Sequence, residues 1–420
     1  MWPVLIMQEK KNAYVTFPWT SPNWAGSEAV LKKWNRGEEN VMERKKNLAY
    51  ILIMLGVKAP KLGALPNSFF VCPGPIDLMI KAVISGSKVF PNGQLCTQTQ
   101  VTSTVKITKF QVFVIEAACF FNLFPNYPYA DMLSNDRFIQ CIANYFEHVW
   151  RKVYADSAWA HKIITVNRRV LGATVNAPNW IASFKKIGKL TINPDKKGIE
   201  DFRDAAQVNF ADPKPGGTLP FANADVVQEE ILFLIYPELF VTQLIVPNME
   251  QNECIVVGGV SRTNNYTGYK RTFRFTGDFT TDDNSISIIF IDASKGHEGL
   301  SVKTLEGKMN RDLNKAYLGF SAIDKTIATG HWGCGAFGGN QQFMSVIQLL
   351  AAAEAEKSIV YAMFGELIDG FGRFYDKLVS MSATVGEIYS GLLFAICKEL
   401  DDYYDTIIKV IHTLRKKNEK

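Results

Sequence analysis

The chain has 420 residues, of which 47% are hydrophobic and 21% charged, and its formal net charge is +5. This balance is typical of a globular protein with a sizeable core, and the charge is too small for a chromatin protein. No stretch reaches the roughly 18 uninterrupted apolar residues of a membrane span. Residues 1–8 are apolar but lack the basic lead and cleavage site of a signal peptide. We therefore expect no membrane attachment and a location in the nucleus, the cytoplasm or both.

The cysteines and histidines show no pattern of a cross-linked or metal-bound framework. The seven cysteines are widely spaced and form no CxxC, and the five histidines lack ligand spacing. We expect reduced cysteines, no metal and no cofactor. Short basic clusters occur at 45–46, 185–186, 196–197 and 415–417. Such clusters are typical of solvated surface, and attraction to an anionic polymer is the alternative.

The first 170 residues are predicted to be mainly helical by the spacing of their apolar residues. Helices are expected at 27–55, 77–83, 109–122 and 135–153. After about residue 176, short β-rich segments alternate with helices. Strands are expected at 207–210, 254–257, 271–275, 287–291, 326–328 and 358–362. The helices between and beyond them are expected at 226–235, 308–318, 341–355 and 366–379.

Strands that alternate with helices predict an α/β domain with three layers, α/β/α, and a mixed central sheet. Residues 254–275 are predicted to form a hairpin, which would give antiparallel neighbours. Residues 385–415 form a long helical pattern, broken at one place, that is expected to pack back on the sheet domain. We therefore divide the chain into a mainly helical accessory region, 1–175, and an α/β domain with C-terminal helices, 176–420.

Two glycines, Gly216 and Gly217, precede the acidic start of a predicted helix. Paired glycines let the backbone turn sharply and approach a ligand closely. Asp225 is the expected N-cap, with Gln228 three residues later as its capping-box partner. The next two residues, both glutamates, therefore fall in the first turn. Acidic residues there also complement the helix dipole, so a purely structural role is the alternative.

Two adjacent carboxylates on a helix favour different tasks for Glu229 and Glu230. Their side chains point about 100° apart, so they do not easily flank one bond as a glycosidase pair does. One would transfer a proton and the other would hold a hydroxyl. Because a helix N-terminus favours the ionised form, a general acid there needs its pKa raised by burial, by the neighbouring carboxylate or by substrate phosphates.

A glycine-rich loop, residues 329–339, follows the strand expected at 326–328 and leads into a helix. Backbone N–H groups in such a loop can hold a diphosphate. Its glycines also satisfy GxGxxG, but the acid that an NAD-linked oxidoreductase needs would fall inside the following helix. A turn without a ligand is the alternative. Tyr266 and Tyr269 lie on a loop, where aromatic rings stack on ligands or serve in packing.

Together these motifs resemble the poly(ADP-ribose) glycohydrolase family, whose catalytic domain is a macrodomain. The family's glycine triplet followed by Gln-Glu-Glu is matched by Gly216, Gly217 and Gln228-Glu229-Glu230. The resemblance covers about 195–395 and continues through 231–233, 236–239, 252–254, 266–269, 313–317 and 332–339. It implies a macrodomain-like fold for the α/β domain.

The resemblance implies a role for each matching residue. Glu230 would be the catalytic acid and base, Glu229 would bind ribose hydroxyls, and Gln228 completes the signature. Glu200 would hydrogen-bond adenine and Phe364 would stack on it. The remaining implied binding residues are Asn209, Asp212, Gly216 and Gly217 near the sugar, Tyr269 closing over the ligand, and Gly333, Gly335, Ala336, Phe337 and Gly338 around the diphosphate.

The chain departs from the family pattern at several places. Thr218 stands in place of the third glycine, and the signature loop is about two residues longer, through 221–224. The pattern Asp-Phe-Ala-Asn begins with Asn209 and ends with Asp212, which adds a negative charge near the sugar. His331 stands where the family has Asn.

The resemblance implies an enzyme that hydrolyses the ribose–ribose bonds of poly(ADP-ribose), mainly from the polymer end. It would release ADP-ribose and leave the protein-linked unit in place, in the setting of the DNA damage response. The expected partners are the polymer and ADP-ribosylated proteins, and a monomer is expected. Two alternatives are a macrodomain that binds ADP-ribose without turnover, because of the changes at Asn209 and Asp212, and an NAD-linked oxidoreductase.

Overall fold

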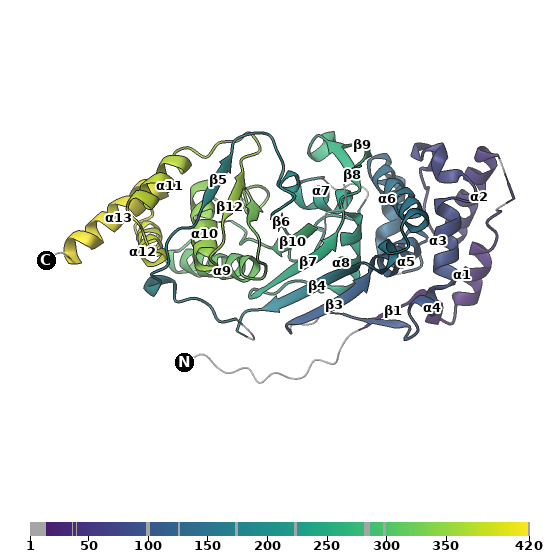
Figure 1. Cartoon of the computed structure of the whole chain (residues 1–420), viewed down its shortest axis with the longest axis horizontal. Helices are drawn as coiled ribbons and strands as arrows, with labels where there is room; N and C mark the ends of the chain where they lie inside the picture. Colours follow the sequence, from purple (N-terminus) through teal and green to yellow (C-terminus); the bar gives the residue numbers. More distant parts are fainter. Residues whose placement is uncertain are drawn as a thin grey trace. The chain divides into compact units, whose positions relative to one another are not determined.

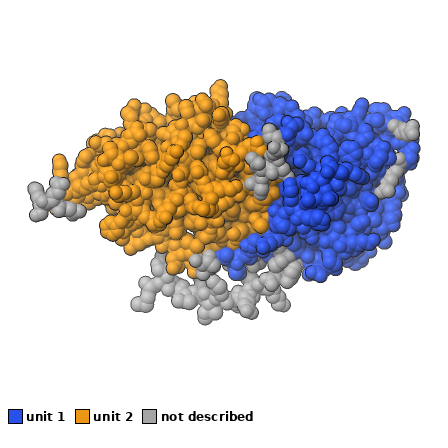
Figure 2. Space-filling model, viewed as in Figure 1, with its two compact units in different colours: residues 1–164, 218–248, 262–281 blue, residues 165–217, 249–261, 282–420 orange. Residues whose placement is uncertain are grey.

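The computed structural model describes residues 14–35, 37–38, 40–97, 101–124, 127–172, 175–221, 225–280, 286–296 and 300–418. The chain forms two compact units, shown in blue and orange in Figure 2. Unit 1 comprises 1–164, 218–248 and 262–281, and unit 2 comprises 165–217, 249–261 and 282–420. Both units are therefore built from segments that alternate along the chain. The division at 175/176 into two contiguous domains stays a prediction.

Unit 1 is mainly helical (Figure 1). Its helices are α1 (Trp24–Leu31), α2 (Val41–Met54), α3 (Pro75–Ile84), α4 (Gly86–Val89), α5 (Lys109–Phe120), α6 (Asp136–Ala155), α7 (Gln228–Ile235) and α8 (Val241–Ile245). Its strands are β1 (Tyr14–Thr16), β2 (Gln94–Cys96), β3 (Ser103–Thr108), β8 (Asn264–Thr267) and β9 (Arg274–Asp278). β1 pairs with β2, and β8 with β9, both antiparallel.

Two of the elements predicted for this part of the chain are wrong. The single helix expected at 27–55 is two helices, because Asn40 caps a new one: its side chain accepts the N–H groups of Met42 and Glu43. The hairpin expected over 254–275 is formed by β8 and β9 instead. The earlier segment, β7 (Glu253–Val260), pairs with two other strands in unit 2.

Helix α7 is buried over almost its whole length. Every residue from Glu229 to Ile235 is buried, and the helix packs against α6 and the 3-10 helix η8 (Pro237–Phe240). After its polar first turn the helix is apolar on all sides, and such a helix needs a position inside the fold. The two glutamates lie in its first turn, as predicted. The predicted cap is wrong: the N-cap is Val227 rather than Asp225, because the Glu230 carboxylate accepts the Val227 N–H.

The sheet of unit 2 is mixed, which confirms the predicted α/β fold. Its strands lie in the order β4-β7-β10-β6-β11-β12-β5. β7 is antiparallel to β4 and β10, and the other neighbours are parallel. The bounds not yet given are β4 (Ile163–Val170), β5 (Leu190–Asn193), β6 (Ala206–Phe210), β10 (Ile286–Ile291), β11 (Ile327–Thr329) and β12 (Ile359–Ala362). The sequence patterns did not predict β4 or β5.

Helices cover this sheet and complete the core of unit 2. All six residues of β10 are buried, as expected for a strand covered on both faces. α9 packs on β7 and β10, and α10 and α12 pack on α9. The helices are α9 (Val302–Phe320), α10 (Gln341–Glu354), α11 (Phe371–Ser380), α12 (Val385–Cys397) and α13 (Tyr403–Asn418). The separation of α12 from α13 confirms the predicted single break in 385–415.

Candidate active site

Glu230 is the centre of the candidate site in unit 1. Its side chain is buried, with only 3% of the residue exposed, although it carries a titratable carboxyl group. One oxygen, Oε1, accepts the backbone N–H of Thr218 at 2.9 Å and the Thr218 hydroxyl at 2.8 Å. The other, Oε2, accepts the Val227 N–H at 3.1 Å. The carboxylate is therefore held in one orientation by three donors.

The surroundings of Glu230 raise the pKa of its carboxyl group. Burial raises the pKa of its carboxyl above the ordinary value, because the ionised form loses its hydration. The hydrogen bonds from Thr218, from the backbone of Glu230 itself and from Val227 lower the pKa, and burial is the larger effect. Burial, one of the causes that the sequence suggested for a raised pKa, is present here. A helix-start glutamate with a raised pKa can serve as a general acid.

Other predicted residues lie around the start of α7. Glu229 is buried, Gln228 is half-buried, and 49% of Tyr269 is exposed. The residue after that tyrosine, Lys270, donates its backbone N–H to the Val226 carbonyl at 2.7 Å. This bond fixes the tyrosine's loop beside the first turn of α7. Part of the lengthened signature loop, 222–224, lies outside the described residues.

The glycine-rich loop of unit 2 connects β11 to α10, as predicted. Gly333 and Gly338 adopt left-handed φ angles of 76° and 67°, which glycine adopts without strain. The Gly339 N–H donates to the Gly333 carbonyl at 2.9 Å, and the buried Trp332 indole donates to the Ile291 carbonyl at 2.9 Å. Asn340 then caps α10. Within the loop, Gly335, Ala336 and Gly338 are exposed and Phe337 is half-buried.

A lysine that sequence reasoning missed contacts this loop. Lys295, in the segment after β10, has its ammonium 4.7 Å from the centre of the Phe337 ring. The same ammonium lies 3.5 Å from Asp212, which follows β6. The Gly296 N–H donates to the Phe337 carbonyl at 2.8 Å, so backbone and side chain both join the two segments. A lone lysine in a loop carries no sequence signal for such a contact.

His331 joins the glycine loop to the segment that carries Phe364. Its Nε2 lies 3.1 Å from the Met363 carbonyl and 3.0 Å from the Glu366 carbonyl. Because both partners are acceptors, Nε2 carries a hydrogen in this arrangement. Phe364, between them, has a φ of 54°, which is uncommon for a residue with a bulky side chain. The backbone is therefore held in a strained conformation where the aromatic ring is presented.

The remaining predicted residues also belong to unit 2. Glu200 is buried in the 3-10 helix η7 (Ile199–Asp201), and Asn209 is fully buried on β6. Gly216 and Gly217 have φ angles of 93° and 56°, which confirms the predicted sharp turn. Gln228, Glu229, Glu230 and Tyr269 belong to unit 1 instead. That all these residues share one site stays a prediction.

Among the described residues there is neither a cluster of metal ligands nor a membrane-spanning helix. No three His, Cys, Asp or Glu side chains among them are grouped as metal ligands would be. No helix that the structure describes is long and apolar enough to cross a membrane.

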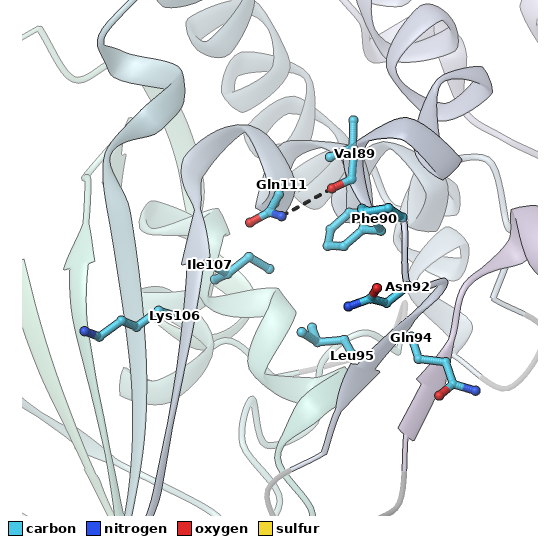
Figure 3. A pocket seen from close by; sticks show the side chains of 9 residues that line it. Val89, Phe90, Asn92, Gln94, Leu95, Lys106, Ile107 and Gln111 are labelled. Atoms are coloured by element: carbon cyan, nitrogen blue, oxygen red, sulfur yellow. Dashed lines mark hydrogen bonds between the residues drawn. The ribbon is translucent and has the colours of Figure 1, made fainter.

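A cavity of about 180 Å³ lies in unit 1 and is lined by Val89–Asn92, Gln94, Leu95, Lys106, Ile107 and Gln111 (Figure 3). The Lys106 and Gln94 side chains extend away from it, and none of the predicted site residues lines it.

Residues 177–367 match the family model described as poly(ADP-ribose) glycohydrolase, macro domain fold. This segment is therefore similar to the poly(ADP-ribose) glycohydrolase family. The match includes β6, α7, the glycine loop and Phe364, so it covers the candidate residues of both units. The predicted macrodomain-like fold is thereby confirmed for the α/β part.

Curated poly(ADP-ribose) glycohydrolases are similar to this chain over part of their length. A probable poly(ADP-ribose) glycohydrolase 2 of Arabidopsis thaliana is 25% identical over 315 residues, which cover 61% of this chain and 58% of the relative. Poly(ADP-ribose) glycohydrolase 1 of Caenorhabditis elegans is 32% identical over 221 residues, 47% of this chain and 28% of the relative. This chain thus spans less than two thirds of these relatives.

Among solved structures, a poly(ADP-ribose) glycohydrolase from Deinococcus radiodurans in complex with ADP-ribose is 20% identical, with a TM-score of 0.32. The similarity covers 46% of this chain and 85% of that one. A poly(ADP-ribose) glycohydrolase from Thermomonospora curvata, bound to the inhibitor ADP-HPD, is 16% identical, with a TM-score of 0.32. It covers 43% of this chain and 75% of that one.

Proposed function

We propose that this protein is a poly(ADP-ribose) glycohydrolase, which hydrolyses ribose–ribose O-glycosidic bonds of the polymer and releases ADP-ribose. The family match over 177–367 and the names of the relatives support this substrate class. The proposed chemistry depends on Glu230, which is buried in the first turn of α7. Thr218 and Val227 hold its carboxyl group, and burial raises the pKa of that group. A carboxyl group whose pKa is raised can give up a proton in one step and take one back in the next.

The reaction follows from two proton transfers at Glu230. The protonated carboxyl donates its proton to the oxygen that leaves the anomeric carbon, and the C–O bond breaks with an oxocarbenium-like transition state. The ionised carboxylate then takes a proton from water, and the water oxygen bonds to the anomeric carbon. The net change is hydrolysis, and Glu230 ends as it began. Three fixed hydrogen bonds keep the carboxylate oriented through both steps.

The other predicted residues would bind and orient the substrate. Glu229, buried beside the acid, would hold ribose hydroxyls, and the glycine loop would hold the diphosphate with its backbone N–H groups. Phe364 would stack on adenine, and its strained φ supports this role, because such strain is often retained at functional sites. We propose the polymer and ADP-ribosylated proteins as partners, in the nucleus or the cytoplasm, and a monomer as the active form.

The decisive experiment replaces the acid. Glu230→Gln should bind ADP-ribose with an affinity close to that of the wild type, because an amide keeps the shape of the side chain. Its release of ADP-ribose from purified polymer should fall by about a hundredfold or more, because the amide donates no proton to the leaving oxygen. Glu43→Gln, which removes a charge on the exposed face of α2, is the matched control and should cleave normally.

The same assay separates hydrolysis from binding alone. A wild-type protein that binds ADP-ribose in calorimetry but releases none from the polymer would be a binding module, and the proposal would be wrong. Normal turnover by Glu230→Gln would show that another group transfers the proton.

A further inference from the structure

We infer that Thr218 is the residue that positions Glu230 for proton transfer, and that its hydroxyl directs the transferable proton to Oε2. The inference rests on the proposed role of Glu230 as acid and base, and it concerns a residue that departs from the glycine of the family pattern. A glycine there has a backbone N–H and no hydroxyl. The threonine therefore adds a donor that the family pattern lacks.

The contacts distinguish the two oxygens of the carboxyl group. Oε1 accepts two bonds, both from Thr218, at 2.9 Å and 2.8 Å. Oε2 accepts the N–H of one other residue, Val227, at 3.1 Å, and the backbone N–H of Glu230 itself also bonds to the carboxyl group. A carboxyl oxygen has two lone-pair positions, so the two bonds from Thr218 fill Oε1. In the protonated acid the carbonyl oxygen is the better acceptor, so Oε1 is the carbonyl and Oε2 carries the proton.

The segment that carries Thr218 is itself held in place within unit 1. The carbonyl of the next residue, Leu219, accepts the Gln243 side-chain amide at 2.9 Å. The Gln243 carbonyl oxygen accepts the Tyr127 hydroxyl at 2.6 Å. These bonds connect the loop to α8 and to the segment before residue 128. The Thr218 hydroxyl therefore meets the carboxylate from a fixed backbone, which is what a positioning role requires.

Charged side chains around α7 have smaller effects on the pKa of Glu230 than burial and hydrogen bonds have. Glu229 lies beside it on α7, Glu238 lies on η8, and Arg137 and His148 lie on α6. In the flanking loops, Asp225 lies 3.9 Å from Arg271. The largest causes of the shift in the Glu230 pKa are burial and the bonds from Thr218. Removal of the hydroxyl is therefore expected to change the protonation of Glu230 directly.

The test compares Thr218→Val, which keeps the shape and loses the hydroxyl, with Thr218→Ser, which keeps the hydroxyl. Because the hydroxyl stabilises the ionised carboxylate, Thr218→Val should move the alkaline limb of the kcat/KM profile upward by about one pH unit. Its kcat should fall about tenfold while KM changes less than about twofold, because a loosely held acid is correctly oriented less often. Thr218→Ser should resemble the wild type.

Thr218→Gly, which places the family's residue here, should show the same upward shift as Thr218→Val because it also lacks the hydroxyl. A wild-type pH profile and kcat in Thr218→Val would overturn the inference. So would a Thr218→Ser protein of normal thermal stability that is as impaired as Thr218→Val.

A second measurement needs no turnover. Infrared titration, with Glu230→Gln subtracted, reports the protonation of the Glu230 carboxyl alone, and its midpoint should rise in Thr218→Val. If that midpoint rises while no variant cleaves polymer, the proposed function fails and the positioning of Glu230 by Thr218 stands. If polymer is cleaved and the midpoint does not move, the role of Thr218 fails and the proposed function stands.

Discussion

The ammonium of Lys295 lies 3.5 Å from the carboxylate of Asp212, the residue that stands in place of the family's asparagine. The negative charge that this departure adds is therefore paired with a positive one. The pair is partly exposed, so it contributes little to the free energy of folding, on the order of 0–1 kcal/mol. Its consequence concerns binding, because Lys295 also lies over the ring of Phe337 in the proposed diphosphate loop.

Lys295→Ala is expected to weaken ADP-ribose binding about fivefold at low salt, because Asp212 then repels the diphosphate without a partner. Asp212→Asn in the same chain should restore most of the affinity, and raised salt should reduce the defect. Isothermal titration of the two single variants and the double variant measures this coupling. Lys377→Ala removes an exposed lysine on α11 and is the control for net charge. Equal affinities for Lys295→Ala and wild type would contradict the prediction.

His331 is expected to present Phe364 through its bonds to the carbonyls on either side, Met363 and Glu366. Phe364→Ala should weaken ADP-ribose binding by about 1–3 kcal/mol, the range measured for stacking of a base on an aromatic ring. His331→Ala should show part of this loss, because the strained backbone at Phe364 can then relax. Fluorescence or calorimetric titration tests both. If His331→Ala binds normally while Phe364→Ala does not, the histidine has no presenting role.

Glu116, on α5, should make the stability of the protein depend on pH. Burial raises the pKa of its carboxyl well above the ordinary value, the nearby Tyr129 hydroxyl lowers it, and the Glu238 carboxylate raises it. The pKa of Glu116 is higher in the folded state than in the unfolded state. The contribution of this carboxyl to the stability of the fold is therefore fully present below about pH 4.5 and is lost as pH rises through the folded-state pKa.

Glu116→Gln should therefore gain stability relative to wild type as pH rises from about 4.5 towards 8, in urea unfolding followed by circular dichroism. Glu147→Gln, on α6, keeps an acceptor for the Ser68 hydroxyl and is the control. If the difference in free energy of unfolding between Glu116→Gln and wild type stayed constant across this range, the prediction would be wrong. The Glu116 carboxyl would then have the same pKa in the folded and unfolded states.

Lys315 is expected to support the fold rather than the chemistry, although it lies in one of the segments that resemble the family. Its ammonium is buried and bonds to Asp292, which also pairs with Arg311. Lys315→Met should lower the free energy of unfolding by about 3–5 kcal/mol, because it leaves a buried carboxylate with one partner fewer. The double change with Asp292→Asn should recover part of the loss in urea unfolding. A stable Lys315→Met protein that fails only in cleavage would assign the lysine to the site instead.

Local sequence patterns predicted the elements that have a clear apolar run or are bounded by glycines. The apolar run of β10 and the glycine-rich link from β11 to α10 are examples, because each depends on residues next to one another. β4 and β5 were missed because their burial alternates or is partial, so no apolar run marks them. The sequence predicted Asp225 as the N-cap of α7, but the N-cap is Val227. The side chain of Glu230 turns back to accept the Val227 N–H, and local sequence patterns do not record this side-chain geometry.

By itself, the sequence determined which chemical groups this protein has: two glutamates at a helix start, two glycine turns and an aromatic after a strand. These follow from residue identity and local spacing. Only the tertiary structure decided that Thr218 holds Glu230, that Lys295 neutralises Asp212, and that α7 packs with the N-terminal helices in unit 1. Lys295 and Asp212 are 83 residues apart in the chain. Such contacts arise from burial and packing of distant segments, which no local pattern records.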